Sequence, residues 1–271
     1  MEQRIMLGKP VADSIKSSLE KKFAGHNITL ATVLVGDDMA SMVYQGRLEK
    51  LAHNLGIKTK TILLPKTITQ TEAEQVLEEL NAETEVKGIL PFMPVPAPLD
   101  GKALCAKIAP AKDVDCLTSQ RQGEFFFGEK KLAPATPRAC LALLKYYNIE
   151  LSGKRVVVLG RSNVVGKPVA MLLLQENATV TICHSQTKNL PTLTGQADIL
   201  VVAMGKANFV TPDMVKPGVV IVDVGINAVD GGLVGDVHPA TYAKASAYTP
   251  VPGGVGVVSN VMIMSALGLN L

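Results

Sequence analysis

The sequence predicts an α/β protein with two domains, each built on a parallel β-sheet, and three observations lead to this prediction. The chain has 271 residues, more than one ordinary domain needs. Short apolar runs rich in β-branched residues alternate with segments whose apolar residues recur every three or four positions, which is typical of βαβ units. The alternation starts again near Pro137 with no flexible linker, so we expect a domain boundary there.

The composition excludes several classes of protein. Hydrophobic residues make up 47% of the chain and charged residues 19%, so a large core can form and intrinsic disorder is excluded. The net charge is only +3 and no basic run occurs, so we expect no nucleic-acid partner. Tryptophan is absent and aromatic residues make up 4%, which argues against surfaces that stack on bases or sugars.

The four cysteines indicate a reducing compartment. Cys105, Cys116, Cys140 and Cys183 form no CxxC pair and show no zinc-ligand spacing. We therefore expect buried, reduced thiols, no metal site and a cytoplasmic protein. The first residues contain no apolar stretch, which predicts that there is no signal peptide.

No charged residue occurs after Lys244, and a lack of charged residues is also typical of membrane-spanning helices. A spanning helix needs about 20 mostly apolar residues. Prolines and glycines within 250–256 interrupt the run, so we expect a buried loop followed by a buried helix and no membrane partner.

The first half of the chain predicts three strands separated by helices. Asp37 or Asp38 is expected to cap the helix that ends at Gly56, and Thr69 with Glu72 forms a capping box for the next helix. Parallel sheets bind ligands beyond the carboxyl ends of their strands, so the loops that follow the strands are candidate site segments. The expected strands are 28–35, 59–64 and 86–90, the expected helices include 11–23 and about 99–108, and the candidate loops are 36–40, 91–98 and 111–118.

The second half repeats this alternation and adds a glycine turn between a strand and a helix. Gly160 and Gly166 are separated by five residues at the place where a Rossmann fold binds a pyrophosphate. The spacing differs from GxGxxG, so a plain strand-to-helix turn is the alternative interpretation. The expected helices are 137–147 and 167–174, and the expected strands are 155–159, 179–183, 199–203 and 219–224.

The end of the second strand in this half favours NADP over NAD. An NAD site usually has Asp or Glu there to bind the ribose 2′-hydroxyl. Here no acidic residue occurs between Glu176 and Asp198, and Ser185 can donate a hydrogen bond to a 2′-phosphate. Arg161 can add a cationic fork. We interpret His184 as a half-exposed polar residue at a strand end, without a catalytic role.

The motifs, taken together, resemble those of one family over nearly the whole chain. In the second half they are Gly160-Arg-Ser-x-Val-Val-Gly-x-Pro168, Cys183-His-Ser-x-Thr187, Asp223-Val-Gly-Ile-Asn227, Gly235-Asp-Val237 and Thr249-Pro-Val-Pro-Gly-Gly-Val-Gly256. In the first half they are Val35-Gly-Asp-Asp-x-Ala-Ser41, Tyr44, Lys112-Asp-Val-Asp115 and Pro134-x-Thr-Pro137. The chain is similar to the methylenetetrahydrofolate dehydrogenase/cyclohydrolase family.

The resemblance implies a fold and an activity. It implies an α/β folate domain, residues 1–137, and a Rossmann-type NADP-binding domain, residues 138–254, with a cleft between them. A C-terminal helix at about 255–271 is expected to pack back on the first domain, and a homodimer is expected through the NADP domains. The implied reaction is oxidation of 5,10-methylenetetrahydrofolate to the methenyl form by hydride transfer to NADP+. Most members then hydrolyse that product to 10-formyltetrahydrofolate.

The resemblance also implies the site residues. Tyr44 matches the aromatic residue that stacks on folate, and Asp115 matches the carboxylate that binds the pterin. The loop containing Pro252, Gly253 and Gly254 matches the loop that lines the cleft. The residues that match the cofactor site are Gly160, Arg161, Ser162, Val165, Gly166, His184, Ser185, Thr187, Gly225 and Ile226.

The departures from the family pattern are concentrated around the substrate residues. Leu48 stands where the family has its catalytic lysine, and Phe92 stands where it has a glutamine that assists this lysine. Lys50 is about 200° of helix rotation away from Leu48, and the guanidinium of Arg47 is a poor general base. Smaller departures are Cys116 in place of a glycine and Val257 in place of a proline.

Three functions are therefore considered. The first is an NADP-dependent dehydrogenase with weak or absent cyclohydrolase activity, since hydride transfer chiefly needs alignment whereas ring hydrolysis needs proton transfers. The second is the bifunctional enzyme, with another group replacing the lysine, and the third is a silent folate- or NADP-binding protein. Three roles stay open: Asp115 either binds pterin or caps local backbone, Tyr44 either stacks on folate or is a core aromatic, and Asp223 either serves the site or merely holds its loop.

Overall fold

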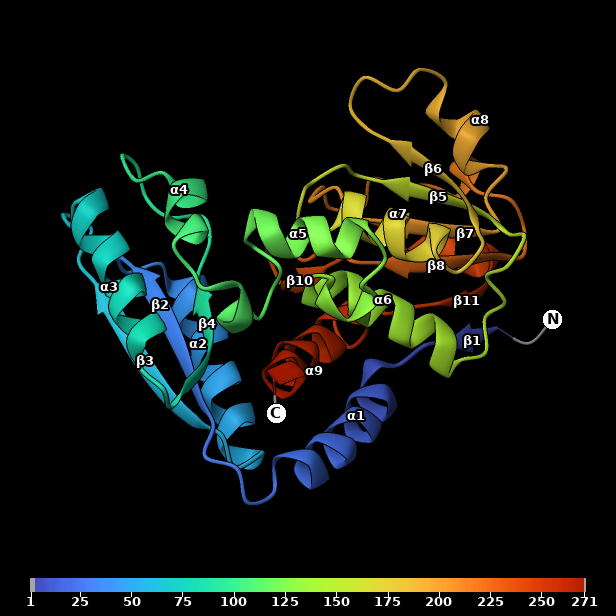
Figure 1. Ribbon diagram of the computed structural model, residues 1–271. Coiled ribbons are helices and arrows are strands. Elements are labelled where there is room, and N and C mark those ends of the chain that lie inside the picture. The colour runs from blue at the N-terminus through green and yellow to red at the C-terminus, as the bar shows by residue number, and fades with distance from the viewer. Residues whose placement is uncertain (1–2, 271) are drawn as a thin grey trace. The chain divides into compact units, whose positions relative to one another are not determined.

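The computed structural model describes residues 3–270, and these group into two compact units (Figure 1). We call one the three-stranded unit; it consists of Ser14–Ala133 and the described residues from Asn260 on. The other, the six-stranded unit, consists of the described residues up to Asp13 and Pro134–Ser259. Helices α1 (Gly8–Phe23) and α9 (Val255–Leu267) each contribute residues to both units.

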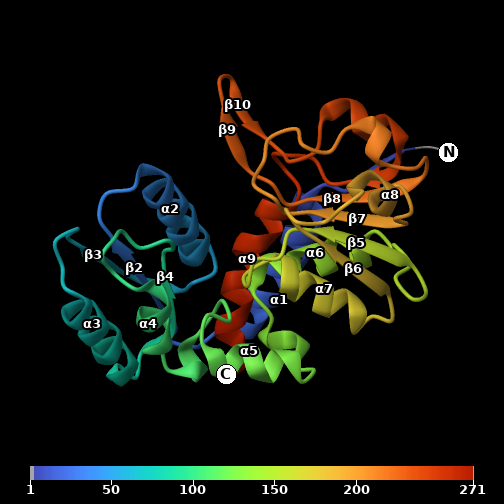
Figure 2. The same cartoon turned by 90° about the horizontal axis from the view of Figure 1, so that it is seen from above.

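The three-stranded unit is built on a parallel sheet in the order β3-β2-β4. Alternate residues of the central strand face opposite layers: Ala31 and Val33 belong to a core cluster with α3 and α4, whereas Thr32 contacts α2. Figure 2 shows α2 on one face of this sheet and α3 and α4 on the other. The bounds are β2 (Thr29–Val35), β3 (Lys58–Leu64), β4 (Val86–Pro91), α2 (Met39–Asn54), α3 (Gln70–Ala82), α4 (Gly101–Ala106) and α5 (Ser119–Phe126).

The caps in this unit follow the sequence closely. Of the two candidate aspartates, Asp38 caps α2, because its carboxylate accepts a hydrogen bond from Ser41 N at 2.8 Å. Asp37 instead pairs with Lys66 at 2.5 Å. The capping box of Thr69 and Glu72 is confirmed. The helix expected at 99–108 is shorter than predicted and begins at Gly101.

The six-stranded unit has the Rossmann-type parallel sheet that the sequence predicts, in the order β1-β11-β8-β7-β5-β6. Helices α6 and α7 pack together, and α7 contacts β5 and β6. A core cluster joins the strands to the apolar residues of α8 and of the segment around Met214. The bounds are β1 (Arg4–Ile5), β5 (Arg155–Leu159), β6 (Thr179–Cys183), β7 (Ile199–Val202), β8 (Val219–Asp223), β11 (Ala245–Tyr248), α6 (Ala135–Tyr146), α7 (Gly166–Leu174) and α8 (Leu190–Thr194).

Four strands of this unit lack a clear sequence signal. β1 is two exposed residues long and pairs with β11, so the N-terminal segment joins this sheet and not the first domain, in which the sequence analysis places it. β11 reads Ala-Ser-Ala-Tyr, which has no apolar run. β9 (Asn227–Val229) and β10 (Gly232–Val234) form an antiparallel hairpin that projects from the unit (Figure 2).

The C-terminal helix ends with a short 3₁₀ turn, Gly268–Asn270, and Leu271 of the expected helix lies outside the described residues. Within the three-stranded unit the side chain of Leu267 lies against Gly88, where a Cβ would overlap with it. All four cysteines are free and buried, as expected. Among residues 3–270, no helix combines the length and the apolar character that crossing a membrane requires.

Candidate functional site

The glycine turn after β5 is closely packed. Gly160 has a φ of +120°, and a Cβ on it would overlap with the carbonyl oxygen of Ala203 after β7. A Cβ on Gly166 would overlap with the carbonyl oxygen of Gly160. Packing within the protein is therefore enough to require both glycines. Because neither glycine has a side chain, a ligand could also approach the backbone of the turn closely.

The hydroxyl of Ser162 lies at the start of the helix that follows this turn. Its Oγ accepts hydrogen bonds from Val165 N at 3.1 Å and from Gly166 N at 3.3 Å. Gly166 is the first residue of α7 and Val165 immediately precedes it, so Ser162 occupies two N–H groups of the kind that bind a phosphate at a helix N-terminus. The side chain of Arg161, one residue earlier, is exposed.

The turn after β6 presents Ser185. His184 N donates to Thr187 Oγ1 at 2.9 Å, and Thr187 N donates to His184 O at 2.8 Å, which closes the turn. Gln186 N donates to Nδ1 of the half-buried His184 at 3.2 Å. Ser185 remains exposed between them. Since Gly160 N donates to Cys183 O, the turns carrying Arg161 and Ser185 follow neighbouring strand ends.

The end of β8 is fixed by Asp223. Its buried carboxylate accepts a hydrogen bond from Gly225 N at 3.0 Å, so Asp223 does hold the adjacent loop. Ile226, which follows, has 61% of its surface exposed. A Cβ on Gly256 would lie 3.4 Å from Cδ1 of Ile226, so these two positions are neighbours within the six-stranded unit.

In the three-stranded unit the predicted substrate residues come together. The rings of Tyr44 and Phe92 meet edge to face, with centroids 5.7 Å apart and planes at 88°. Burial, and then the negative charge of Asp115, raise the pKa of Tyr44 well above its usual range. The structure therefore gathers Tyr44, Phe92 and Asp115, which are distant in the sequence, at one end of the sheet.

The position of the family lysine lies in the core. Leu48 is one helical turn after Tyr44 and has no exposed surface, and Phe92 is 7% exposed. Lys50 and Arg47 are exposed, as the helical rotation predicted for Lys50. On the same helix the buried Gln45 donates to Thr32 Oγ1 at 2.9 Å. Apolar side chains thus fill both positions at which the resemblance leads us to expect polar ones.

Asp113, two residues before Asp115, holds the backbone of this segment. The Asp113 carboxylate accepts hydrogen bonds from Asp115 N, Leu117 N and Thr118 N at 3.2, 3.0 and 2.8 Å. Lys112 donates to the carbonyl oxygens at the end of α3, at 2.6 to 3.1 Å. Two charged residues of the motif, Lys112 and Asp113, thus hold backbone groups, which the sequence alone did not indicate.

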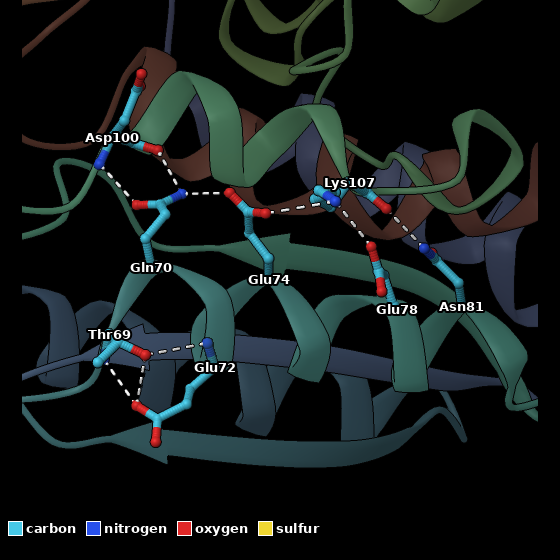
Figure 3. A network of polar contacts seen from close by, with 8 residues as sticks. All are labelled: Thr69, Gln70, Glu72, Glu74, Glu78, Asn81, Asp100 and Lys107. Atoms are coloured by element: carbon cyan, nitrogen blue, oxygen red, sulfur yellow. Dashed lines mark hydrogen bonds and ion pairs between the residues drawn. The ribbon is translucent and has the colours of Figure 1, made fainter.

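A polar network fixes α4 against α3 and so positions the segment that leads to Asp115 (Figure 3). Gln70 Oε1 accepts from Asp100 N at 2.9 Å at one end of the network. Lys107 contacts Glu74 and Glu78 at 3.4 and 2.9 Å. Asn81 donates to Lys107 O at 2.7 Å at the other end, so α4 is anchored along its whole length.

The loop of Pro252, Gly253 and Gly254 belongs to the six-stranded unit, unlike the other predicted substrate residues. Gly253 O accepts a hydrogen bond from Gly8 N at 2.7 Å. A Cβ on Gly254 would lie 2.6 Å from Pro250 O, so the loop has no room for a side chain there.

The fold and these turns define an α/β protein with a Rossmann-type dinucleotide-binding unit. Residues 6–115 match the family model for the tetrahydrofolate dehydrogenase/cyclohydrolase catalytic domain. Residues 134–269 match the model for the NAD(P)-binding domain of the same family. The chain therefore belongs to the tetrahydrofolate dehydrogenase/cyclohydrolase family.

Individual relatives agree over nearly their full length. "Bifunctional protein FolD" of Clostridium perfringens is 45% identical over 267 residues, which cover 96% of each chain. The FolD methylenetetrahydrofolate dehydrogenase/cyclohydrolase structure from Campylobacter jejuni is 38% identical, with a TM-score of 0.96 over 99% of this chain and 98% of that one. The Trypanosoma brucei FolD structure, complexed with NADP and an inhibitor, is 33% identical, with a TM-score of 0.92 over 98% and 97% of the two chains.

Proposed function

We propose that the protein oxidises 5,10-methylenetetrahydrofolate to 5,10-methenyltetrahydrofolate, with NADP+ as the hydride acceptor. Family membership across both units carries this proposal. The trypanosomal relative binds NADP. In this chain Arg161 and Ser185 follow neighbouring strand ends, with no acidic residue between Glu176 and Asp198. A guanidinium and a hydroxyl suit a 2′-phosphate, which a carboxylate at that place would repel.

The oxidation depends on alignment more than on acid–base catalysis. When bound, NADP+ supplies the ring that accepts the hydride. The C–H bond of the methylene carbon breaks, its electron pair leaves with the hydride, and the cationic methenyl group remains without any proton transfer. We assign Tyr44 to stacking on folate, Asp115 to binding the pterin, and residues 252–254 to the loop that lines the site. Their part is to hold the carbon in line for transfer.

We further propose that hydrolysis of the methenyl product is weak or absent. This step needs a positioned water and proton transfers, and each acid–base group contributes about 10²- to 10⁴-fold. The full burial of Leu48 and the contact of Phe92 with Tyr44 support the proposal, because neither apolar side chain can move a proton.

A second candidate function is the complete bifunctional activity, which the names of the relatives favour. It requires some other group to take the place of the lysine. A third candidate, a folate- or NADP-binding protein without catalysis, is favoured only by the altered substrate residues.

Two assays on one preparation separate these functions. One follows NADPH formation from methylenetetrahydrofolate, and the other follows loss of methenyltetrahydrofolate absorbance after subtraction of the buffer-catalysed rate. We expect the first activity without the second. Comparable rates would establish the bifunctional enzyme, and loss of both activities, with NADP binding retained, would establish the silent binder.

We also propose a cytoplasmic homodimer that acts on a small folate substrate, as the family resemblance implies. Sedimentation of the purified protein would test the dimer, and fractionation of the cells that produce it would test the location.

A further inference from the structure

Two buried carboxylates lie at the carboxyl edge of the six-stranded sheet. Asp236, with no exposed surface, accepts four hydrogen bonds. Three come from consecutive backbone N–H groups after β7, those of Met204, Gly205 and Lys206, at 2.6, 2.9 and 2.8 Å. The fourth comes from Nδ2 of Asn227, after β8, at 2.9 Å.

Asp223 is the second carboxylate and is 1% exposed. It accepts from Gly225 N, Asp236 N, Val237 N and the hydroxyl of Tyr242, each at 3.0 Å. Asp223 therefore fixes the backbone of Asp236, whose side chain in turn fixes the loops after β7 and β8.

The surrounding glycines leave room for these carboxylates. A Cβ on Gly225 would overlap with the carboxyl group of Asp236, and a Cβ on Gly235 would overlap with that of Asp223. This packing explains why the motifs Asp223-Val-Gly-Ile-Asn227 and Gly235-Asp-Val237 occur together.

The donors bonded to the two carboxylates are neutral N–H and O–H groups. Burying an anion is unfavourable, and eight such bonds are needed to offset the cost. A turn satisfied by backbone bonds alone would avoid this cost. The burial of these two carboxylates is explained if the function of the protein requires the loops after β7 and β8 to be held in fixed positions.

The loops after β7 and β8 lie along one part of the carboxyl edge of the six-stranded sheet, where we propose that the cofactor binds. Arg161 and Ser185 place the 2′-phosphate at the ends of β5 and β6. A dinucleotide bound to a Rossmann sheet crosses the edge from there. Since the strand order is β6-β5-β7-β8, its nicotinamide half would reach the ends of β7 and β8. Ile226 lies there, exposed between two fixed residues, Gly225 and Asn227.

We propose that Asp236 is a positioning residue for hydride transfer, which locks the loops after β7 and β8 together and so fixes Ile226 against the nicotinamide half of the cofactor. This inference rests on the proposed dehydrogenase function. Asp236 acts through the loops and does not contact the reacting atoms.

The test compares Asp236→Asn with Asp198→Asn. Asp198 also accepts a backbone hydrogen bond, from Arg155 N at 2.8 Å, and pairs with Lys216 at 2.5 Å, but it precedes β7 at the opposite edge of the sheet. A misplacement of about 1 Å can cost about 100-fold in rate. We therefore expect Asp236→Asn to lower kcat by about 10- to 100-fold while the Kd for NADP+ changes less than about threefold. Asp198→Asn should leave both constants unchanged.

Hydrogen exchange of the protein without cofactor gives a second measurement. In Asp236→Asn the amides of Met204, Gly205 and Lys206 should exchange faster than in the unmutated protein. Asn227→Ala, the milder variant, should release only the loop after β8 and lower kcat less. Equal kcat values for Asp236→Asn and Asp198→Asn would overturn the inference alone. An unmutated protein that binds NADP+ but forms no NADPH would overturn the proposed function as well.

Discussion

The candidate site residues of the six-stranded unit and those of the three-stranded unit are of opposite kinds. At the carboxyl edge of the six-stranded sheet the motif residues are polar, and Ser162, Thr187, Asp223 and Asp236 each bond backbone groups. In the three-stranded unit Leu48 and Phe92 are buried and apolar. The motif residues of the six-stranded unit are thus suited to binding and alignment, while the side chains of Leu48 and Phe92 offer no group that could move a proton.

The largest effect is expected from placing a lysine at position 48 and a glutamine at position 92. Leu48→Lys combined with Phe92→Gln should raise methenyltetrahydrofolate hydrolysis by about 100-fold or more, the contribution of one acid–base group. Each single variant should gain little. A lone ammonium at the fully buried position 48 would be desolvated without a partner, which costs stability and lowers its pKa. Hydrolysis rates of the four proteins give the coupling between the positions. Additive single effects would show that the two residues do not act as a unit.

The next effect concerns the choice of cofactor by the six-stranded unit. Arg161→Ala should reduce the preference for NADP+ over NAD+ by about 10- to 150-fold, since a charge-assisted hydrogen bond contributes about 1.5–3 kcal/mol. The ratio of kcat/KM values for the two cofactors measures this. Arg155→Ala is the matched control, because Arg155 is also exposed but begins β5 at the other edge. Equal kcat/KM values for NADP+ and NAD+ in the unmutated protein would contradict the NADP assignment.

Substitutions of two neighbouring aspartates distinguish substrate binding from folding in the three-stranded unit. Asp115→Asn should raise the KM for methylenetetrahydrofolate by about tenfold, the effect of weakening one hydrogen bond to a charged group, with little change in stability. Asp113→Asn should instead lower the free energy of unfolding by about 1–3 kcal/mol, because its carboxylate serves three backbone N–H groups. Urea unfolding and substrate titration distinguish the two. Similar behaviour of both variants would remove the assigned role of Asp115.

A further effect, which concerns neither binding nor catalysis, is a dependence of stability on high pH. Burial, followed by the charges of Asp113 and Asp115, raises the pKa of Cys105 to about 11, and burial raises that of Cys140 to about 12. A free thiol has a pKa of about 8.5. The folded state therefore retains protons that the unfolded state loses. Stability should be complete below about pH 8.5 and fall above it, by up to about 1.4 kcal/mol per pH unit for each thiol. Urea midpoints from pH 7.5 to 10.5 measure this fall, and Cys140→Ala should reduce it.

The fold was largely predictable because its main elements carry local signals. The strands 155–159 and 179–183 match the observed β5 and β6, and the Thr69–Glu72 capping box begins α3 as expected. The hairpin, β1 and β11 were not predicted, since short strands without an apolar run form only where a neighbouring strand pairs with them.

The site was predictable only in part. The glycine turn and the approximate place of Ser185 follow from residues that are close in the sequence. The role of Asp236 does not, because the N–H groups that it binds after β7 lie about thirty residues earlier. The sequence contained one usable sign of it, the glycine immediately before Asp236.

The sequence by itself determined the alternation of strands and helices, the caps and the glycine turn, because each depends on hydrogen bonds and sterics within a few residues. The tertiary structure alone decided that Asp38 and not Asp37 caps α2, that Asp113 accepts hydrogen bonds from the backbone that follows it, and that Tyr44 meets Phe92. The last of these contacts joins side chains from α2 and the end of β4, whose approach is set by packing on the sheet and by no local preference.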